Sequence, residues 1–210
     1  LFGVVAVFVV STTPISSSSS CPNYGDIRDD SVSATNFSID EFSGTWYMVA
    51  TSEPTLPTFC VCGINEVNVD AEAGTYNYTN IDYCDHLDHN ISIHIAGRLS
   101  SDPNSPGLLH ENAEIFNHTV GQLDPNMIFK VNRDAAGNIV ELFTYACLGK
   151  VPPVVGKELF SFNLLSRSNW YADEKLQALV AGANASSSGY LDLEGVRFNN
   201  MTTYRDCHML

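Results

Sequence analysis

Short runs of alternating hydrophobic and polar residues, separated by turn-forming sequences, constrain the fold of this chain more than any other feature. The clearest run is Asn90–Leu99, in which Ile91, Ile93 and Ile95 alternate with small or polar residues. Successive side chains of a β-strand point to opposite faces of its sheet, so this alternation predicts a strand with one buried face. Loop sequences such as Ser101–Gly107, rich in Pro, Asn and Asp, interrupt the runs. The pattern predicts an all-β domain.

Eight runs of this kind follow one another, and the short loop Ala71–Gly74 between the second and third reads as a hairpin that places Asp70 opposite Thr75. Eight antiparallel strands can close into an up-and-down barrel whose interior holds one small ligand. The predicted strands are Gly44–Thr51, Gly63–Asp70, Thr75–Tyr83, Asn90–Leu99, Glu111–Val120, Met127–Asn132, Ile139–Cys147 and Glu158–Leu165.

One segment, Ala172–Ala183, is predicted to be helical because it is rich in strong helix formers. Leu176, Leu179 and Val180 fall on one face at helical spacing, and Gly182 marks the expected end. The fold class that we expect is therefore an all-β, eight-stranded antiparallel up-and-down barrel with one C-terminal α-helix packed outside.

The charge of the chain restricts its partners. Its 24 Asp and Glu residues against 10 Lys and Arg give a formal net charge of −14 over 210 residues. A field of this sign repels polyanions, so we expect no nucleic-acid partner. After the first dozen residues no segment approaches the roughly 20 apolar residues that a membrane helix needs, so we expect no stable membrane insertion. A monomer or weak oligomer is expected.

The first 20 residues are expected to be a targeting segment. Leu1–Val10 is continuously apolar and is followed by a Ser-rich stretch, the pattern of a secretory signal peptide. Residues 1–20 are therefore assigned to a signal-peptide remnant and Ser-rich segment, and residues 21–210 to the folded domain. We expect a secreted, extracellular protein, with the lumen of a secretory-type organelle or a plastid as the alternative.

Cysteines and glycosylation sequences support an oxidising compartment. The six cysteines all follow the targeting segment, and six allow 15 pairings. They are Cys21, Cys60, Cys62, Cys84, Cys147 and Cys207. Six Asn-x-Ser/Thr sequences are candidate glycan acceptors. Their asparagines are Asn36, Asn77, Asn90, Asn117, Asn184 and Asn200.

Two motifs resemble the lipocalin family, a branch of the calycin superfamily. Gly44-Thr-Trp46 in the first strand resembles the family's G-x-W signature, and Leu164–Asn169 resembles its strand-to-helix segment, whose Arg lies across the Trp. The resemblance implies a cation–π contact between Arg167 and Trp46, which makes Gly44, Trp46 and Arg167 a structural signature. It spans nearly all of residues 21–207 and departs from the family at the turn Asn132–Asp134.

The cysteine pattern resembles apolipoprotein D-like lipocalins and also plant plastid lipocalins. It implies that Cys21 pairs with Cys147, that Cys207 pairs with Cys60 or Cys62, and that the remaining cysteine of those two pairs with Cys84. The hairpin register places Cys84 opposite the residue between Cys60 and Cys62, so register leaves both choices open, and a bulge could favour either.

The family resemblance implies that the chain carries a small hydrophobic ligand: a retinoid, sterol, fatty acid, carotenoid or tetrapyrrole. A glycan at Asn77 must point outward, so strand alternation turns Tyr76 and Tyr78 into the barrel, and Met48 shares the inward face of Trp46. The candidate ligand-binding residues are Met48, Tyr76, Tyr78, Ile93, Phe129, Phe143, Tyr145, Phe160 and Phe162.

Two alternatives remain open. A lipocalin-fold enzyme, such as a lipid or pigment isomerase or de-epoxidase, would use inward acids, for which Glu114 and Glu141 are the mid-strand candidates. A scavenger or inhibitor would act through its loops. We expect no catalytic residue, no cofactor and no metal, because the spacing in Cys84–His89 matches no standard zinc site and no catalytic motif is present.

Overall fold

The computed structural model describes residues 22–52, 60–84, 91–115, 118–149, 159–187, 189 and 196–198. Within the strands, side chains are described except at 61, 62, 91, 113–115, 118–125, 147–149 and 159.

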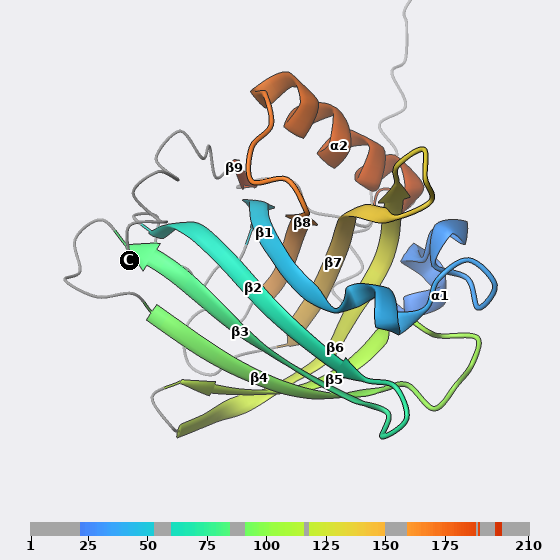
Figure 1. Cartoon of the computed structure of the whole chain (residues 1–210), viewed down its shortest axis with the longest axis vertical. Coiled ribbons are helices and arrows are strands. Elements are labelled where there is room, and N and C mark those ends of the chain that lie inside the picture. The colour runs from blue at the N-terminus through green and yellow to red at the C-terminus, as the bar shows by residue number, and fades with distance from the viewer. Residues whose placement is uncertain are drawn as a thin grey trace, which may run out of the picture.

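Eight antiparallel strands close into an up-and-down barrel (Figure 1). Each strand pairs with the next along the chain, and β1 pairs with both β8 and β2, which completes the ring. This confirms the predicted fold class. The strands are β1 Gly44–Thr51, β2 Cys60–Asp70, β3 Thr75–Cys84, β4 Ile91–Leu99, β5 Leu108–Ile115, β6 His118–Arg133, β7 Ile139–Gly149 and β8 Leu159–Ser166.

A ninth strand of two residues, β9 (Arg197–Phe198), also pairs with β1, on the same side as β2. The lower part of β1, from Gly44 to Met48, pairs with β2, whereas Ala50 and Thr51 pair with β9. The partner of β1 on this side therefore changes partway along the strand.

One predicted strand is wrong: Glu111–Val120 runs across two strands, because β5 ends at Ile115 and β6 begins at His118. The two residues between them include no Gly or Pro, so the sequence gives no turn signal there. Asp124-Pro125, which resembles a turn, lies inside the 16-residue β6. Proline is tolerated at that point because the β5–β6 register shifts between Leu109 and Glu111, and a bulge needs no regular donor there.

The predicted helix is present as α2, Asp173–Ser186, and packs outside the barrel (Figure 1). The sequence predicted that the helix ends at Gly182. The helix instead continues past Gly182, which lies inside it. Leu176, Val180 and Ala183 are buried against the outer face of the sheet. The N-terminal segment adds three short helical turns that the sequence pattern did not predict: α1 Tyr24–Ile27, η1 Asp30–Val32 and η2 Ile39–Phe42.

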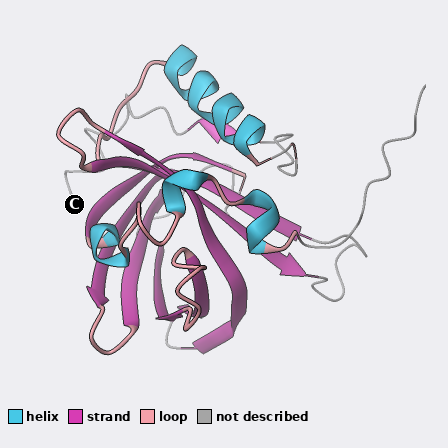
Figure 2. Cartoon of the chain, turned by 90° about the vertical axis from the view of Figure 1, so that its right-hand side faces the viewer, coloured by secondary structure: helices cyan, strands magenta, loops and turns pink. Residues whose placement is uncertain are grey.

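Those short turns lie across one end of the barrel, as Figure 2 shows. We call this the floor; it comprises Phe37, Phe42 and Trp46 with the strand ends around them, which share one buried cluster. The opposite end, where the chain passes from β1 to β2, from β3 to β4, from β5 to β6 and from β7 to β8, is called the mouth.

Trp46 and Arg167 hold the floor together, as the resemblance implies. Trp46 is fully buried, and its indole Nε1 donates to the Phe42 carbonyl at 2.7 Å. The Arg167 guanidinium carbon lies 3.6 Å from the centroid of the Trp46 ring. Its nitrogens also donate to the carbonyls of Ser43 and Thr45, both at 2.7 Å. One arginine thus covers the indole and satisfies the backbone that leads into β1.

Gly44, which lies between these carbonyls, has a φ of +102°, a conformation that side chains rarely adopt. A Cβ there would also lie 3.0 Å from Arg167 Nη1. The glycine of the G-x-W motif therefore allows the backbone conformation at this position and leaves space for the Arg167 side chain.

At Asn132–Asp134, where the sequence departs from the family, Arg133 contacts the N-terminal segment beside the floor. Arg133 pairs with Glu41 of η2 at 2.5 Å and donates to the Asn36 carbonyl at 2.6 Å. Arg133 beside Glu41 holds the pKa of that carboxyl below its usual value. The turn after β6 is thus joined to the N-terminal segment.

Replacing Trp46 with Ala is expected to lower the free energy of unfolding by about 3–5 kcal/mol, as for other buried aromatic residues. Urea denaturation followed by circular dichroism measures the change. The chain's other tryptophan, Trp170, is 54% exposed and provides the matched control. Trp170→Ala is expected to change stability by less than about 0.5 kcal/mol. Equal losses in the two variants would contradict the assigned role of Trp46.

Candidate functional site

The alternation along β3 shows which side chains face the inside of the barrel. Tyr76 lies in the same buried cluster as Trp46, and Tyr78 packs against that cluster. Asn77, between them, is exposed. Tyr76 and Tyr78 therefore face the inside of the barrel, and Asn77 faces outward. By the same parity, Asn80 and Asp82 also face inward, and both are buried.

The interior nearest the floor is filled with hydrophobic side chains. Tyr76 and Tyr78 stack with 6.4 Å between ring centroids, and Phe42 meets both rings edge-on. This packing leaves the floor half of the interior as a hydrophobic core. Its other buried members are Val32, Phe37, Trp46, Met48, Val67, Leu109, Ile128, Val131, Ile139, Leu142 and Leu165.

Several inward positions outside the hydrophobic cluster of the floor are polar. Thr51 Oγ1 donates to Asn163 Oδ1 at 2.6 Å, and Asn80 Nδ2 donates to Asn65 Oδ1 at 3.0 Å. These are cross-strand neighbours, since Thr51 pairs with Asn163 and Asn65 pairs with Asn80. The wall above the floor therefore presents amides and hydroxyls as well as apolar groups. Its remaining polar members are Asp82, Glu111, Asn126, Thr144 and Ser161.

Glu111 accepts hydrogen bonds from two other side chains. It lies in one cross-strand row with Gly97 and Tyr76 and is only 2% exposed. The Tyr76 hydroxyl donates to its Oε1 at 2.7 Å, and Asn126 Nδ2 donates to its Oε2 at 2.9 Å. A Cβ on Gly97 would meet the Tyr76 ring at 2.1 Å. The absent side chain at Gly97 thus lets the tyrosine cross β4 and reach the carboxylate.

Several inward-facing side chains are not fully buried. Ile93, Asn126 and Asn163 face the interior by register but keep partial exposure, unlike the floor residues. Solvent therefore reaches the inside of the barrel above the floor.

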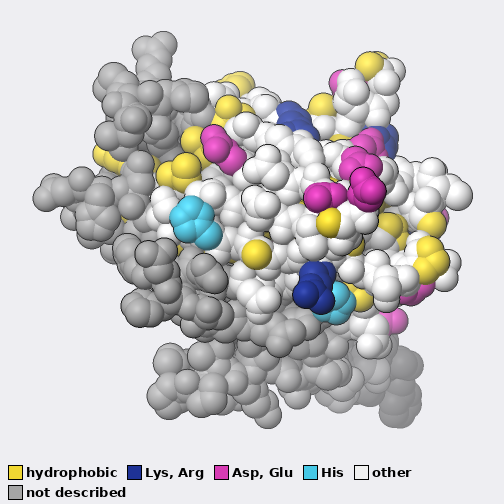
Figure 3. Space-filling model, turned by 60° about the horizontal axis from the view of Figure 1, so that its bottom comes forward, with side chains coloured by type: hydrophobic (Ala, Val, Ile, Leu, Met, Phe, Trp, Pro, Cys, Tyr) yellow, Lys and Arg dark blue, Asp and Glu magenta, His cyan; other side chains and the backbone are white. Residues whose placement is uncertain are grey.

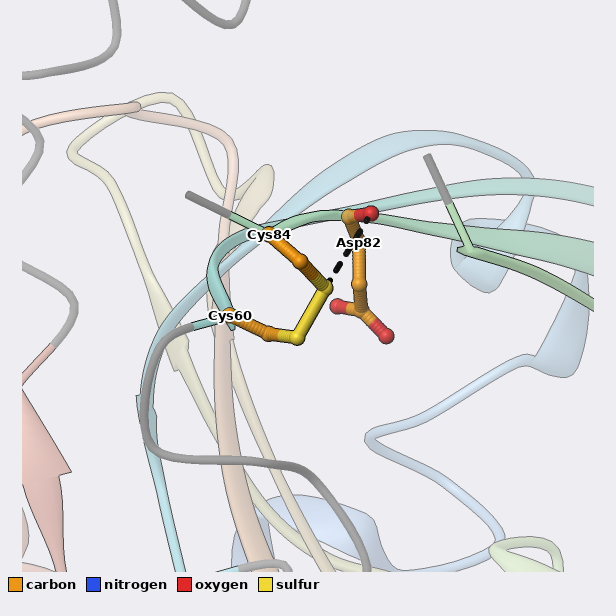
Figure 4. The surroundings of a disulfide bond; sticks show 3 residues. All are labelled: Cys60, Asp82 and Cys84. Carbon is orange, nitrogen blue, oxygen red and sulfur yellow. Dashed lines mark hydrogen bonds between the residues drawn. A yellow bond between two sulfur atoms is a disulfide. The ribbon is translucent and has the colours of Figure 1, made fainter. Parts of the chain in front are cut away.

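A disulfide between Cys60 and Cys84 joins β2 to β3 at the mouth, with an S–S distance of 2.01 Å (Figure 4). The β2–β3 register follows the predicted pairing from Asp70 and Thr75 up to Cys62, which lies opposite Tyr83. A bulge then shifts the register by one residue and places Cys60 opposite Cys84. Of the two alternatives left open by the sequence, Cys60 is thus the partner of Cys84.

The other expected disulfides stay predictions. Cys21 and Cys207 lie outside the described residues, and the side chains of Cys62 and Cys147 are also outside them. With Cys60 assigned to Cys84, the expected partner of Cys207 is Cys62.

Three solved structures with the same architecture belong to one family. Insecticyanin from the tobacco hornworm Manduca sexta is 15% identical over 80% of this chain and 82% of its own, with a TM-score of 0.58. The tryptamine complex of the amine-binding protein of Rhodnius prolixus is 16% identical (81% and 84% covered, TM-score 0.55). Lobster apocrustacyanin A1 is 15% identical (76% and 77% covered, TM-score 0.52). All three are lipocalins. This chain has the lipocalin fold.

No protein-family model and no curated protein matches the sequence. The lipocalin likeness therefore rests on the fold and on the motifs that close its floor, and a particular closeness to apolipoprotein D-like or plastid members stays a prediction.

Five of the nine candidate ligand residues lie on the outer face of the lipocalin barrel, which corrects their expected inward placement. They belong to the core that also contains Leu176 and Val180 of α2. Because α2 covers this face, β6, β7 and β8 are hydrophobic on both sides, and alternation alone could not assign the faces. The five are Phe129, Phe143, Tyr145, Phe160 and Phe162. Met48, Tyr76, Tyr78 and Ile93 face inward.

Of the two acids proposed for the enzymatic alternative, Glu141 also lies outside the interior, and the side chain of Glu114 is outside the described residues. Glu141 faces α2, where the Tyr171 hydroxyl donates to it at 2.9 Å and Lys175 lies 3.5 Å away. Burial raises the pKa of Tyr171 to about 12, so its hydroxyl stays protonated and can donate at neutral pH. Glu114 pairs in register with His94, an exposed residue.

Among the described side chains, the buried inward acids are instead Asp82 and Glu111, which the sequence reasoning missed. Asp82 could have been found, since it has the same strand parity as Tyr76 and Tyr78. Glu111 was hidden because the expected strand began at that residue, three positions after the true start of β5.

For the candidate zinc motif, residues 85–90 lie outside the described residues, and Cys84 is bonded to Cys60.

Removing the mouth disulfide with Cys60→Ala and Cys84→Ala together is expected to lower the free energy of unfolding by roughly 3 kcal/mol, from the loop-closure entropy of a 24-residue separation. Urea denaturation without reductant measures it. Peptide mapping of the unreduced protein checks the pairing and should yield one peptide pair joining Cys60 to Cys84. A pair joining Cys62 to Cys84 would contradict the assignment.

Proposed function

We propose that this protein is a secreted lipocalin that binds a small hydrophobic molecule inside its barrel and carries it through water. The observation that carries the proposal is the partial exposure of inward-facing Ile93, Asn126 and Asn163 above a completely filled floor. A ligand entering from the mouth would rest on that floor and be surrounded by β-strands. The proposed role is carriage, not catalysis, and needs no cofactor.

Binding would be driven by removing apolar ligand surface from water, which contributes about 0.8 kcal/mol for each buried methylene. Met48, Ile93 and Ile95 offer apolar contacts, while the amides and hydroxyls of the wall accommodate a polar end. The tryptamine bound by the amine-binding protein, an aromatic body with one polar end, is a molecule of this general kind. Retinoids, sterols, fatty acids, carotenoids and tetrapyrroles were the classes that the family resemblance implied.

Secretion is supported by the disulfide between Cys60 and Cys84, which favours an oxidising compartment. Two glycosylation sequences, at Asn36 and Asn77, also present exposed asparagines. Within the described part of the chain, no helix has the length and hydrophobicity to cross a membrane. The surface in Figure 3 shows hydrophobic side chains scattered among polar ones, as expected for a face in contact with water.

Replacing Ile93 with Trp is expected to fill the interior and to raise the Kd for a neutral lipophilic probe, N-phenyl-1-naphthylamine, at least tenfold. Fluorescence titration measures the Kd. Ala96→Trp introduces the same side chain on the exposed outer face of β4 and is expected to leave the Kd unchanged. Binding that is equally strong in both variants would place the ligand outside the barrel and contradict the proposal.

Glycan occupancy is expected to follow exposure when the protein is made in secreting eukaryotic cells. Asn77→Gln should remove one glycan's mass, because Asn77 points outward from β3. Asn184→Gln should leave the mass unchanged apart from the substitution, because Asn184 lies within α2 with its Oδ1 buried. Intact-protein mass spectrometry decides, and a glycan on Asn184 with none on Asn77 would contradict this expectation.

A further inference from the structure

Among the described inward side chains, the ionisable groups are all acidic. Two of the described inward side chains are carboxylic acids, Asp82 and Glu111, both 2% exposed. None of the described inward side chains is Lys, Arg or His. Because the field of the whole protein is also negative, with a net charge of −14, an anionic ligand group would meet repulsion at the mouth and again at the wall.

The surroundings of Glu111 form a built acceptor site. Both of its carboxyl oxygens accept hydrogen bonds, one from Tyr76 and one from Asn126, as suits the charged carboxylate. Asn126 turns its amide nitrogen to Glu111, while its buried Oδ1 receives no hydrogen bond within the described part of the structure. Two acceptor groups, a carboxylate and an amide oxygen, are therefore held together where the interior keeps partial exposure at Asn126.

We propose that this barrel selects its ligand by charge: it binds small apolar molecules that bear a protonated amine and discriminates against the corresponding carboxylic acids, with Glu111 as the anchoring group. This inference rests on the proposed function and names its ligand class. An ammonium group supplies several donors and no acceptor, which complements Glu111 and the Asn126 oxygen. A carboxylate end supplies only acceptors and adds a like charge. Fatty acids and the propionates of tetrapyrroles are therefore disfavoured among the classes considered above.

The test uses three ligands of one chain length: decylamine, decanol and decanoate, each displacing N-phenyl-1-naphthylamine from the full chain at pH 7. Decylamine is expected to bind at least tenfold more tightly than decanoate, with decanol between them. Glu111→Gln is expected to reduce this ratio at least fivefold. Glu66→Gln makes the same change of charge at an exposed residue of β2 and is expected to leave the ratio unchanged.

The outcomes separate the two proposals. If neither the probe nor decanol binds the wild-type protein, the proposed function fails. If they bind but decylamine shows no preference over decanoate, or Glu66→Gln lowers the preference as much as Glu111→Gln, the charge selection is overturned and the proposed function stands.

Thermal denaturation first shows whether Glu111→Gln is folded. If it is not, the wild-type ratio is measured at 20 mM and 500 mM NaCl. A buried anchor keeps its preference in high salt, whereas a preference due to surface charge is screened away, which would overturn the inference.

Discussion

The stacking of Arg167 on Trp46 is the contact on which the arrangement of this barrel depends. Arg167 follows β8 directly, and Trp46 lies in β1, so their contact brings together the last and first strands of the ring. The same guanidinium binds the carbonyls that lead into β1. A cation, an indole and residues of the N-terminal helical turns pack at that end, and the partly exposed inward side chains lie above them. The fold thus positions the site by closing one end of the barrel.

The interior is hydrophobic near the floor and carries polar side chains elsewhere, and the two parts have different roles. Near the floor, closely packed hydrophobic side chains supply stability. Outside this cluster, the wall contains asparagines, a threonine and two acids, whose burial is tolerated because many of them are hydrogen-bonded to side chains of other strands. A wall of this kind recognises a ligand's polar end, whereas the floor contributes shape.

Sequence reasoning predicted the barrel, the outer helix and the floor because these depend on local signals: alternation, helix formers and the G-x-W motif. It failed at the β5–β6 connection, where neither Gly nor Pro marks the turn after Ile115. It also misplaced aromatic residues such as Phe143, since the helix that covers them makes both faces of β7 hydrophobic. Glu111 was missed because the predicted strand began at that residue, so neither its place inside β5 nor its contacts with Tyr76 and Asn126 could be inferred from the pattern. Which face a strand buries is a property of its neighbours, and the sequence of one strand cannot show it.

The change of partner along β1 has a mechanical consequence. Above Met48, the ring's hydrogen bonds between β1 and β2 give way to a pairing with the two-residue β9. On this side, β1 is therefore hydrogen-bonded to the barrel strand β2 near the floor and to β9, from a distant part of the chain, near the mouth. β9 follows α2 in the chain, so this pairing attaches the segment after the outer helix to the first strand. A displacement of the upper part of β1 would therefore be passed to the segment that follows α2, whereas a displacement of its lower part would be passed to β2.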